Sequence, residues 1–192
     1  MDGNSINDFY RKTFLAFQWA FMFLRWAFFP ILVILLPILS TPFRRRLLFE
    51  CQNKIDPLSK AWPQGVEADV AFEVSSEGEL EQASPLIRAS LESNQRVEVF
   101  YASESLEKKI QNLGRSLGRE RENIRFLRMP LLTAFPFSFG KGQSFFQLVT
   151  AKKLVLCRYD FYPELLLYGA KKDCSFILLN ATLKGKEETL RR

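Results

Sequence analysis

The chain contains no histidine and only three cysteines among its 192 residues. Histidine is the side chain that most often serves as general base near neutral pH and as metal ligand, so neither role can be filled by a histidine in this chain. Cys51, Cys157 and Cys174 show no Cys-x-x-Cys spacing, which indicates reduced thiols rather than a disulfide framework. We therefore predict no metal site and no catalysis by a Cys/His pair.

Two binding motifs are also missing. The Gly-Lys-Gly at 140–142 does not form a P-loop, because the upstream Gly and the following Lys-Ser/Thr are absent. The charged run 119–125 has no recognised nucleic-acid motif beside it, so a solvated loop is the better interpretation. A formal net charge of +6 then favours an anionic membrane surface or a phosphorylated substrate as partner, and we predict no nucleic acid partner.

The most apolar stretch runs from Phe14 to Leu39. A helix needs about 20 mainly apolar residues to cross a bilayer, and this stretch is long enough. Arg25 near its middle and prolines at 30 and 37 interrupt it, so a strained span and a helix lying in the membrane interface both remain open. We predict a membrane-associating helix within residues 1–42.

A basic stretch and a linker occupy residues 43–65. Arg44, Arg45 and Arg46 directly follow the apolar segment, which places the following domain in the cytoplasm by the positive-inside rule. The same arginines suit anionic headgroups or acceptor phosphates, although the topology signal alone also explains them. Pro57, Pro63 and Gly65 indicate a linker into the globular part.

Residues 66–192 alternate between strand and helix patterns. This alternation predicts an α/β fold with a parallel sheet. Helices are expected after residue 76, over 103–117 and over 165–172, and an apolar loop, folded onto the sheet edge or forming a membrane-facing lid, over 129–142. The expected strands are Val70–Val74, Arg96–Tyr101, Ile124–Leu127, Lys153–Cys157 and Ser175–Leu179.

The turn after the first strand combines a helix cap with several carboxylates. Ser76 and Glu79 have the spacing of a capping box, and Pro85 is expected to kink or limit the helix that follows. Gly78 leaves room for close approach to the backbone, and Glu79 lies near the sheet edge where ligands bind in open α/β folds. Crowding by Glu73 and Glu77 exceeds what a cap requires. A structural cap and a functional carboxylate both remain open.

Residues 73–79 and the following LEQASPLIRA resemble the signature turn of the Kdo transferases, which add 3-deoxy-octulosonic acid to lipid A precursors. The family's pattern is matched in collinear order over roughly residues 66–184, while its His falls on Glu73 and its first acid after the fourth strand falls on Arg158. The matching positions are Ser76, Gly78, Glu79, Pro85, Leu86, Pro163, Asn180 and Ala181, with Asp160 at the family's second acid.

The resemblance implies the Rossmann-like N-terminal half of a two-domain glycosyltransferase, preceded by a membrane helix. It implies Glu79 as general base and no cofactor, with CMP-Kdo as donor if a separate nucleotide-sugar-binding domain is supplied. It also implies a lipid A precursor as acceptor at the cytoplasmic side of a bacterial inner membrane. The implied acceptor-binding residues are Ser76, Gly78, Arg158, Asp160 and Asn180.

Because no second domain can be assigned in the sequence, we expect no sugar transfer by the chain alone. For Arg158 and Asp160 a local ion pair is an equally good interpretation. A non-catalytic membrane-anchored α/β module that binds a lipid or scaffolds a partner is the competing hypothesis, and the absent His and the charge reversal at Arg158 favour it.

Overall fold

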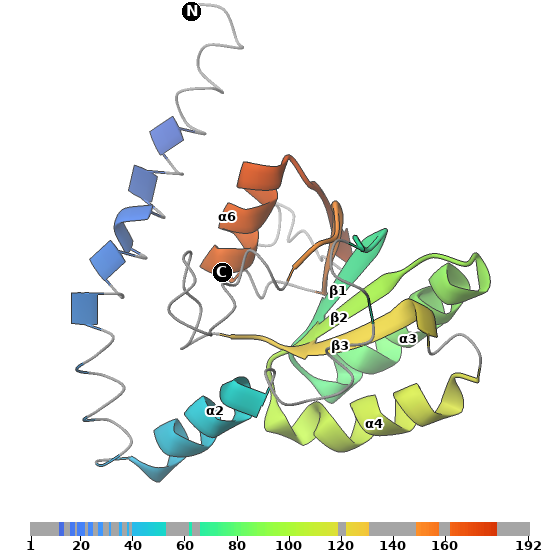
Figure 1. The fold of residues 1–192 in the computed structure, drawn as a ribbon, viewed down its shortest axis with the longest axis horizontal. Coiled ribbons are helices and arrows are strands. Elements are labelled where there is room, and N and C mark those ends of the chain that lie inside the picture. The colour runs from blue at the N-terminus through green and yellow to red at the C-terminus, as the bar shows by residue number, and fades with distance from the viewer. Residues whose placement is uncertain are drawn as a thin grey trace, which may run out of the picture.

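A single parallel sheet organises the described part of this computed structural model (Figure 1). The structure describes residues 40–52, 62, 66–118, 122–130, 149–157 and 162–179, together with scattered residues between 12 and 38. The strand order is β3-β2-β1-β4-β5. The strands are β1 (Val70–Val74), β2 (Val97–Tyr101), β3 (Ile124–Arg128), β4 (Lys153–Cys157) and β5 (Ser175–Leu179).

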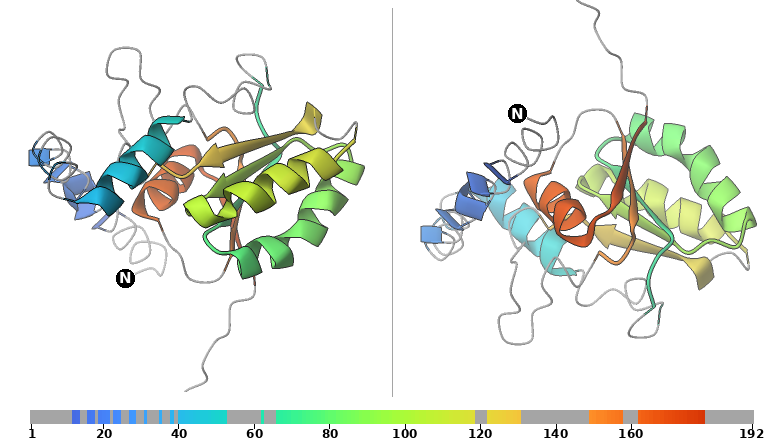
Figure 2. Two further views of the ribbon diagram at one scale, coloured as in Figure 1. Left: turned by 90° about the horizontal axis from the view of Figure 1, so that it is seen from below. Right: turned by 90° about the horizontal axis from the view of Figure 1, so that it is seen from above.

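Helices cover both faces of the sheet, as the continuous apolar runs of its central strands require. α3 (Glu77–Glu92) and α4 (Glu107–Ser116, entered through the short 3₁₀ helix η3, Glu104–Leu106) lie on one side. α6 (Pro163–Lys172) lies on the other side, as Figures 1 and 2 show. Every residue of β1 and β2 is consequently buried.

The strand order changes direction at the neighbouring strands β1 and β4: β2 and β3 are added on one side of this pair, and β5 is added on the other. From β1 the chain passes to β2 and β3 through helices on one face, and from β4 to β5 through α6 on the opposite face. Right-handed crossovers demand this change of face when the direction changes. The carboxyl ends of β1 and β4 therefore flank a topological switch point, and the arrangement is Rossmann-like.

Two apolar cores fill the spaces between the layers. One joins α3 and α4 to the sheet, with Ile87, Leu106 and Ile110 almost fully buried. The other joins α6 to the opposite face, with Leu165 and Tyr168 buried. Gly169 allows α6 to approach β5, because a Cβ at this position would overlap the ring of Phe176.

The sequence-based prediction of an α/β fold with a parallel sheet is confirmed, with strand bounds shifted by one residue at most. Lys153–Cys157 and Ser175–Leu179 agree at both ends. Pro85 does not limit its helix, because α3 continues through it to Glu92. The predicted loop over 129–142 lies outside the described residues beyond Pro130, and the linker is described only at Trp62.

The edge strand β5 is less covered than the other strands. Phe176, Ile177 and Leu178 are each more than two-fifths exposed, although alternate residues of a strand point to opposite faces. Leu179 packs against the core on the α3 side. The described residues thus bury β5 incompletely on both of its faces.

The predicted N-terminal membrane helix is not supported by the described residues. Those between 12 and 38 are helical, and large apolar side chains among them are exposed, Phe17 and Ile38 most of all. In the part of the chain that the structure describes, no helix is both long and apolar enough to span a bilayer. α2 (Thr41–Cys51) follows, with a proline in its first turn where no backbone donor is needed.

Candidate functional site

The turn after β1 brings Glu79 to the switch point. β1 ends at Val74, Ser75 follows, and Ser76 caps α3 with extended backbone. Glu79 is the third residue of the helix, so its carboxylate returns over the turn toward the carboxyl edge of the sheet. In open parallel sheets ligands bind in the crevice at this position.

The carboxylate of Glu79 completes a capping box, as the spacing predicted. Its Oε2 atom accepts hydrogen bonds from Ser75 N at 2.7 Å, Ser75 Oγ at 2.8 Å and Ser76 N at 3.2 Å. Ser76 Oγ in turn accepts from Glu79 N at 3.4 Å. Glu79 is only 4% exposed, so these contacts fix its orientation. A catalytic role for Glu79 remains a prediction.

The crowding of carboxylates around this turn is relieved by Lys109 on α4. Glu77 points outward, and its Oε2 lies 2.9 Å from Lys109 Nζ. Lys109 also binds Glu81 at 2.7 Å, and the hydrogen bonds that it donates to the carboxylates of Glu81 and Glu77 raise its pKa. Glu73 is buried within β1. Glu77 therefore contributes to contacts between α3 and α4 at the surface, while Glu73 and Glu79 are buried.

Cys157 ends β4 on the other side of the switch point. Burial, together with the nearby carboxylates of Glu73 and Glu79, raises the pKa of its thiol to about 12. The thiol is therefore protonated at neutral pH and is a poor nucleophile. The same electrostatic coupling shows that the acids from β1 and α3 lie close to the end of β4.

The remaining predicted site residues are placed only in part. A Cβ added at Gly78 would meet no atom within 4 Å, so the space beside this backbone is open. Arg158, Asp160 and Asn180 lie outside the described residues, and their predicted roles stay predictions. The structure thus brings Ser76, Gly78 and Glu79 together in one turn.

α2 covers the neighbouring part of the same edge. Arg46 donates to the carbonyl oxygen of Ala102, just after β2, and to that of Met129, just after β3, the latter at 2.7 Å. Its Nε binds Glu50 at 2.7 Å, and Glu50 is almost fully buried. Phe49 packs edge-on against Tyr101 with ring centroids 5.8 Å apart. Arg46 thus holds α2 against two strand ends.

A cavity of about 490 Å³ lies between α2, α4 and the end of β3. At its base Arg128 binds Glu107 through two hydrogen bonds, of 2.6 and 3.2 Å, and Tyr101 Oη donates to Glu107 at 2.9 Å. The sequence pattern did not point to these residues, because 21 positions separate Arg128 and Glu107. The lining residues are Arg45, Leu48, Phe49, Gln52, Glu104, Glu107, Gln111 and Arg128.

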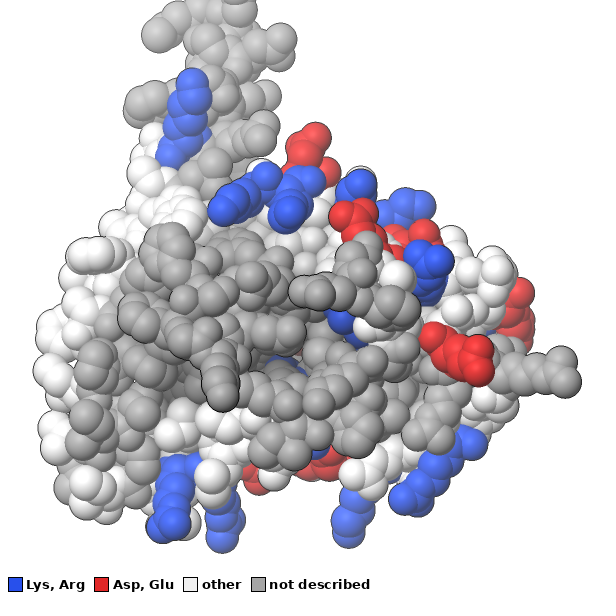
Figure 3. Space-filling view, in the orientation of Figure 1, with Lys and Arg blue, Asp and Glu red and all other residues white. Residues whose placement is uncertain are grey.

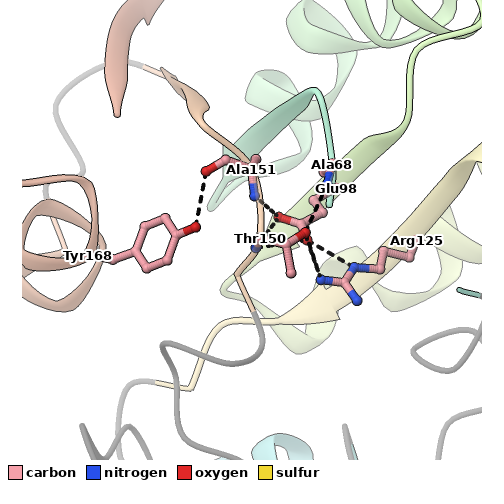
Figure 4. Close-up of polar contacts among 6 residues, drawn as sticks. All are labelled: Ala68, Glu98, Arg125, Thr150, Ala151 and Tyr168. Atoms are coloured by element: carbon pink, nitrogen blue, oxygen red, sulfur yellow. Dashed lines mark hydrogen bonds and ion pairs between the residues drawn. The ribbon is translucent and has the colours of Figure 1, made fainter. Parts of the chain in front are cut away.

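A second polar cluster lies at the opposite, amino edge of the sheet (Figure 4). Glu98 in β2 is fully buried and pairs with Arg125 of β3. Thr150 donates to Glu98 from its hydroxyl at 2.7 Å and from its backbone N–H at 3.1 Å. Arg125 also lies over the ring of Trp62 at 4.8 Å. This network closes the amino edge, away from the switch point between β1 and β4.

Surface charge does not single out one area of the face drawn in Figure 3. Lys and Arg side chains project along its margins, and Asp and Glu side chains lie among them. Basic and acidic side chains are therefore interspersed on the described part of this face. A phosphate-rich polymer binds best to a continuous basic surface, which the described part of this face does not present.

Comparisons with protein-family models, with curated proteins and with solved structures found no match for this chain. The resemblance to the Kdo transferases thus remains a prediction from sequence.

Proposed function

We propose that this chain is a Kdo transferase-like acceptor domain, in which Glu79 is the general base for an acceptor hydroxyl. The observation that carries the proposal is the position of Glu79 at the switch point of a parallel sheet. All three hydrogen bonds to its carboxylate end on Oε2. Within the described residues none ends on Oε1, which leaves this atom for the proton of a substrate.

The local structure suits proton transfer from a sugar hydroxyl. A general base needs to come within hydrogen-bond reach of the proton that it removes, in a fixed orientation. Ser75 and Ser76 supply this orientation through Oε2. The absence of a side chain at Gly78 keeps the approach open. In this proposal the sugar donor is CMP-Kdo, held by a separate nucleotide-sugar-binding domain.

The membrane is the proposed location of the acceptor, a lipid A precursor at the cytoplasmic side of a bacterial inner membrane. Support comes from exposed apolar side chains in the N-terminal helical residues, among them Phe23 and Phe28. Arg44 and Arg45 are exposed on α2, which follows these residues. Cationic side chains near an anionic surface contribute about 1 kcal/mol each to binding.

The test is the transfer of labelled Kdo from CMP-Kdo to a lipid A precursor, with the nucleotide-sugar domain of a known Kdo transferase added. Glu79→Gln keeps the size of the side chain and one acceptor oxygen but removes the base. We expect transfer to fall by about 10² or more, the usual contribution of general base catalysis. Glu77→Gln, which changes an exposed neighbouring carboxylate, is the matched control. Unchanged transfer by Glu79→Gln contradicts the proposal.

A non-catalytic membrane-anchored module is the second candidate. The near-complete burial of Glu79 and its capping bonds favour it, because a cap explains this residue without chemistry. This candidate predicts binding to lipid A precursor vesicles, with no transfer under any of the conditions above. Vesicle flotation combined with the transfer assay separates the two candidates: binding without transfer by the wild-type chain supports the module, whereas transfer that Glu79→Gln loses while it still binds vesicles supports the enzyme.

A further inference from the structure

We propose that the cavity between α2 and α4 binds an uncharged saccharide unit through the planar polar side chains on its walls. The cavity lies beyond the ends of β2 and β3, beside the crevice of Glu79. This inference does not depend on catalysis at Glu79. The volume of about 490 Å³ falls in the range of small-molecule sites.

The base of the cavity is preorganised. Arg128 is 6% exposed, and its guanidinium is held by the carboxylate of Glu107 at 2.6 Å. The ring of Phe49 lies 5.4 Å from the same guanidinium, and Tyr101 Oη fixes the other carboxylate oxygen. Since paired charges on packed side chains move little, binding a ligand above them costs little ordering of the protein.

The walls carry hydrogen-bonding groups that remain available. Arg45 and Gln52 come from α2, and Glu104 and Gln111 come from η3 and α4. All four are exposed. Among the described residues none of these four side chains makes a hydrogen bond or ion pair. Together they offer several donors and acceptors on both sides of one space.

The charge balance selects the class of ligand. Arg45 and Arg128 are opposed by Glu104 and Glu107, so the lining carries no net charge. A phosphate in this space would meet two carboxylates, which repel it. An apolar ligand would remove four polar side chains from water without replacing their hydrogen bonds. A saccharide supplies hydroxyl groups that both donate and accept, and the exposed Leu48 offers an apolar surface to the sugar ring.

The direct test is a ¹H–¹⁵N NMR titration of the full chain in a detergent without a sugar headgroup. Glucose, N-acetylglucosamine and the N-acetylglucosamine disaccharide are the probes, and inorganic phosphate is the competing anion. We expect the side-chain amides of Gln52 and Gln111 to shift with at least one saccharide and not with phosphate. The proposal is overturned if these amides shift with phosphate alone, or if none of the probes shifts them.

A pair of variants locates the binding site on α4. Gln111→Leu removes a lining amide, and we expect it to weaken saccharide binding about tenfold, the effect of one or two lost hydrogen bonds. Asn112→Leu is the matched control, because Asn112 is exposed on the same helix and does not line the cavity. The backbone spectrum of each variant reports whether it is folded. Equal binding by both variants overturns the proposal.

Discussion

At the scale of single residues, the buried carboxylates of Glu98 and Glu79 differ in how many of their oxygens accept hydrogen bonds. Glu98 accepts hydrogen bonds on both oxygens, from Arg125, Thr150 and Ala151, and has no exposed surface. Glu79 accepts hydrogen bonds from the described residues on Oε2 alone, at the edge where ligands bind in open parallel sheets. The arrangement around Glu98 stabilises the fold, whereas the arrangement around Glu79 is also compatible with its proposed role as general base.

Removing one member of the Glu98–Arg125 pair should destabilise the protein strongly. Glu98→Leu leaves the guanidinium of Arg125 poorly solvated and two backbone donors near Thr150 without their acceptor. We expect a loss of about 3–5 kcal/mol in the free energy of unfolding. Urea denaturation measures it. The double variant Glu98→Leu/Arg125→Leu should lose less than the sum of the single variants, and additive losses would contradict this account.

The buried thiol of Cys157 makes stability depend on alkaline pH. Its pKa is about 12 in the folded chain, above the ordinary value of 9.0. Between these values the folded state retains a proton that the unfolded state has lost, so stability falls as pH rises above about 9. Urea midpoints at pH 8 and pH 10.5 measure this fall. We expect the urea midpoint of Cys157→Ala to fall less between these pH values than that of the wild type. An equal fall in the two proteins would show that this thiol is not the cause.

The same thiol should resist alkylation in the folded chain. Cys51 is exposed and Cys157 is buried, so iodoacetamide at pH 8 should modify Cys51 first. Peptide mass spectrometry before and after unfolding in urea distinguishes the two sites. Equal modification of both thiols without denaturant would show that the end of β4 opens readily.

At the scale of elements, α2 depends on one of three consecutive arginines. Arg46 is partly buried and binds two strand-end carbonyl oxygens, whereas Arg44 and Arg45 are exposed. From the sequence the three arginines could be described only as one basic stretch, because nothing in a run of identical residues shows which side chain faces the protein. Phe49 and Glu50, three and four residues after Arg46, are buried, and residues at this spacing share one face of a helix. Arg46 is therefore the arginine that faces the protein.

Arg46→Lys should therefore loosen α2, while Arg44→Lys should not. Lysine cannot reproduce the fork that reaches Ala102, Met129 and Glu50 together. We expect a loss of about 1–3 kcal/mol, as for a buried group left without its partner. Hydrogen exchange of the α2 amides measures the loosening locally. Equal exchange in the two variants would show that Arg46 does not hold the helix.

Strands and caps were predictable from the sequence because their signals are local. Val70–Val74 is a short apolar run, and Ser76 and Glu79 have the spacing of a cap. The cavity and the Glu98 network were not predictable, because their members are far apart in the chain. Thr150 reaches Glu98 across 52 positions, and only the strand order brings the two together.

At the scale of the whole molecule, strand order determines which residues share an edge. The reversal between β1 and β4 brings Glu79 and Cys157 to one crevice. α2 lies at the same edge, and the exposed apolar residues of the N-terminal helical part precede it. The proposed membrane contact and the proposed site therefore belong to the same end of the sheet.

This arrangement predicts binding to anionic vesicles. Vesicles that contain phosphatidylglycerol should float with the chain, and a variant that lacks residues 1–39 should remain in solution. Arg44→Gln/Arg45→Gln should weaken flotation severalfold, and added salt should weaken that of the wild type, because the basic contribution is screened. Flotation that does not differ between wild type and the truncated variant would contradict the prediction.

The bonds of Arg46 end on main-chain oxygen atoms of Ala102 and Met129. They are therefore indifferent to which side chains occupy these two positions. They depend instead on the number of residues in β2 and β3, since one inserted residue would turn the required carbonyl away. The attachment of α2 to the sheet is thus more sensitive to an insertion or deletion in β2 or β3 than to the identity of these two side chains.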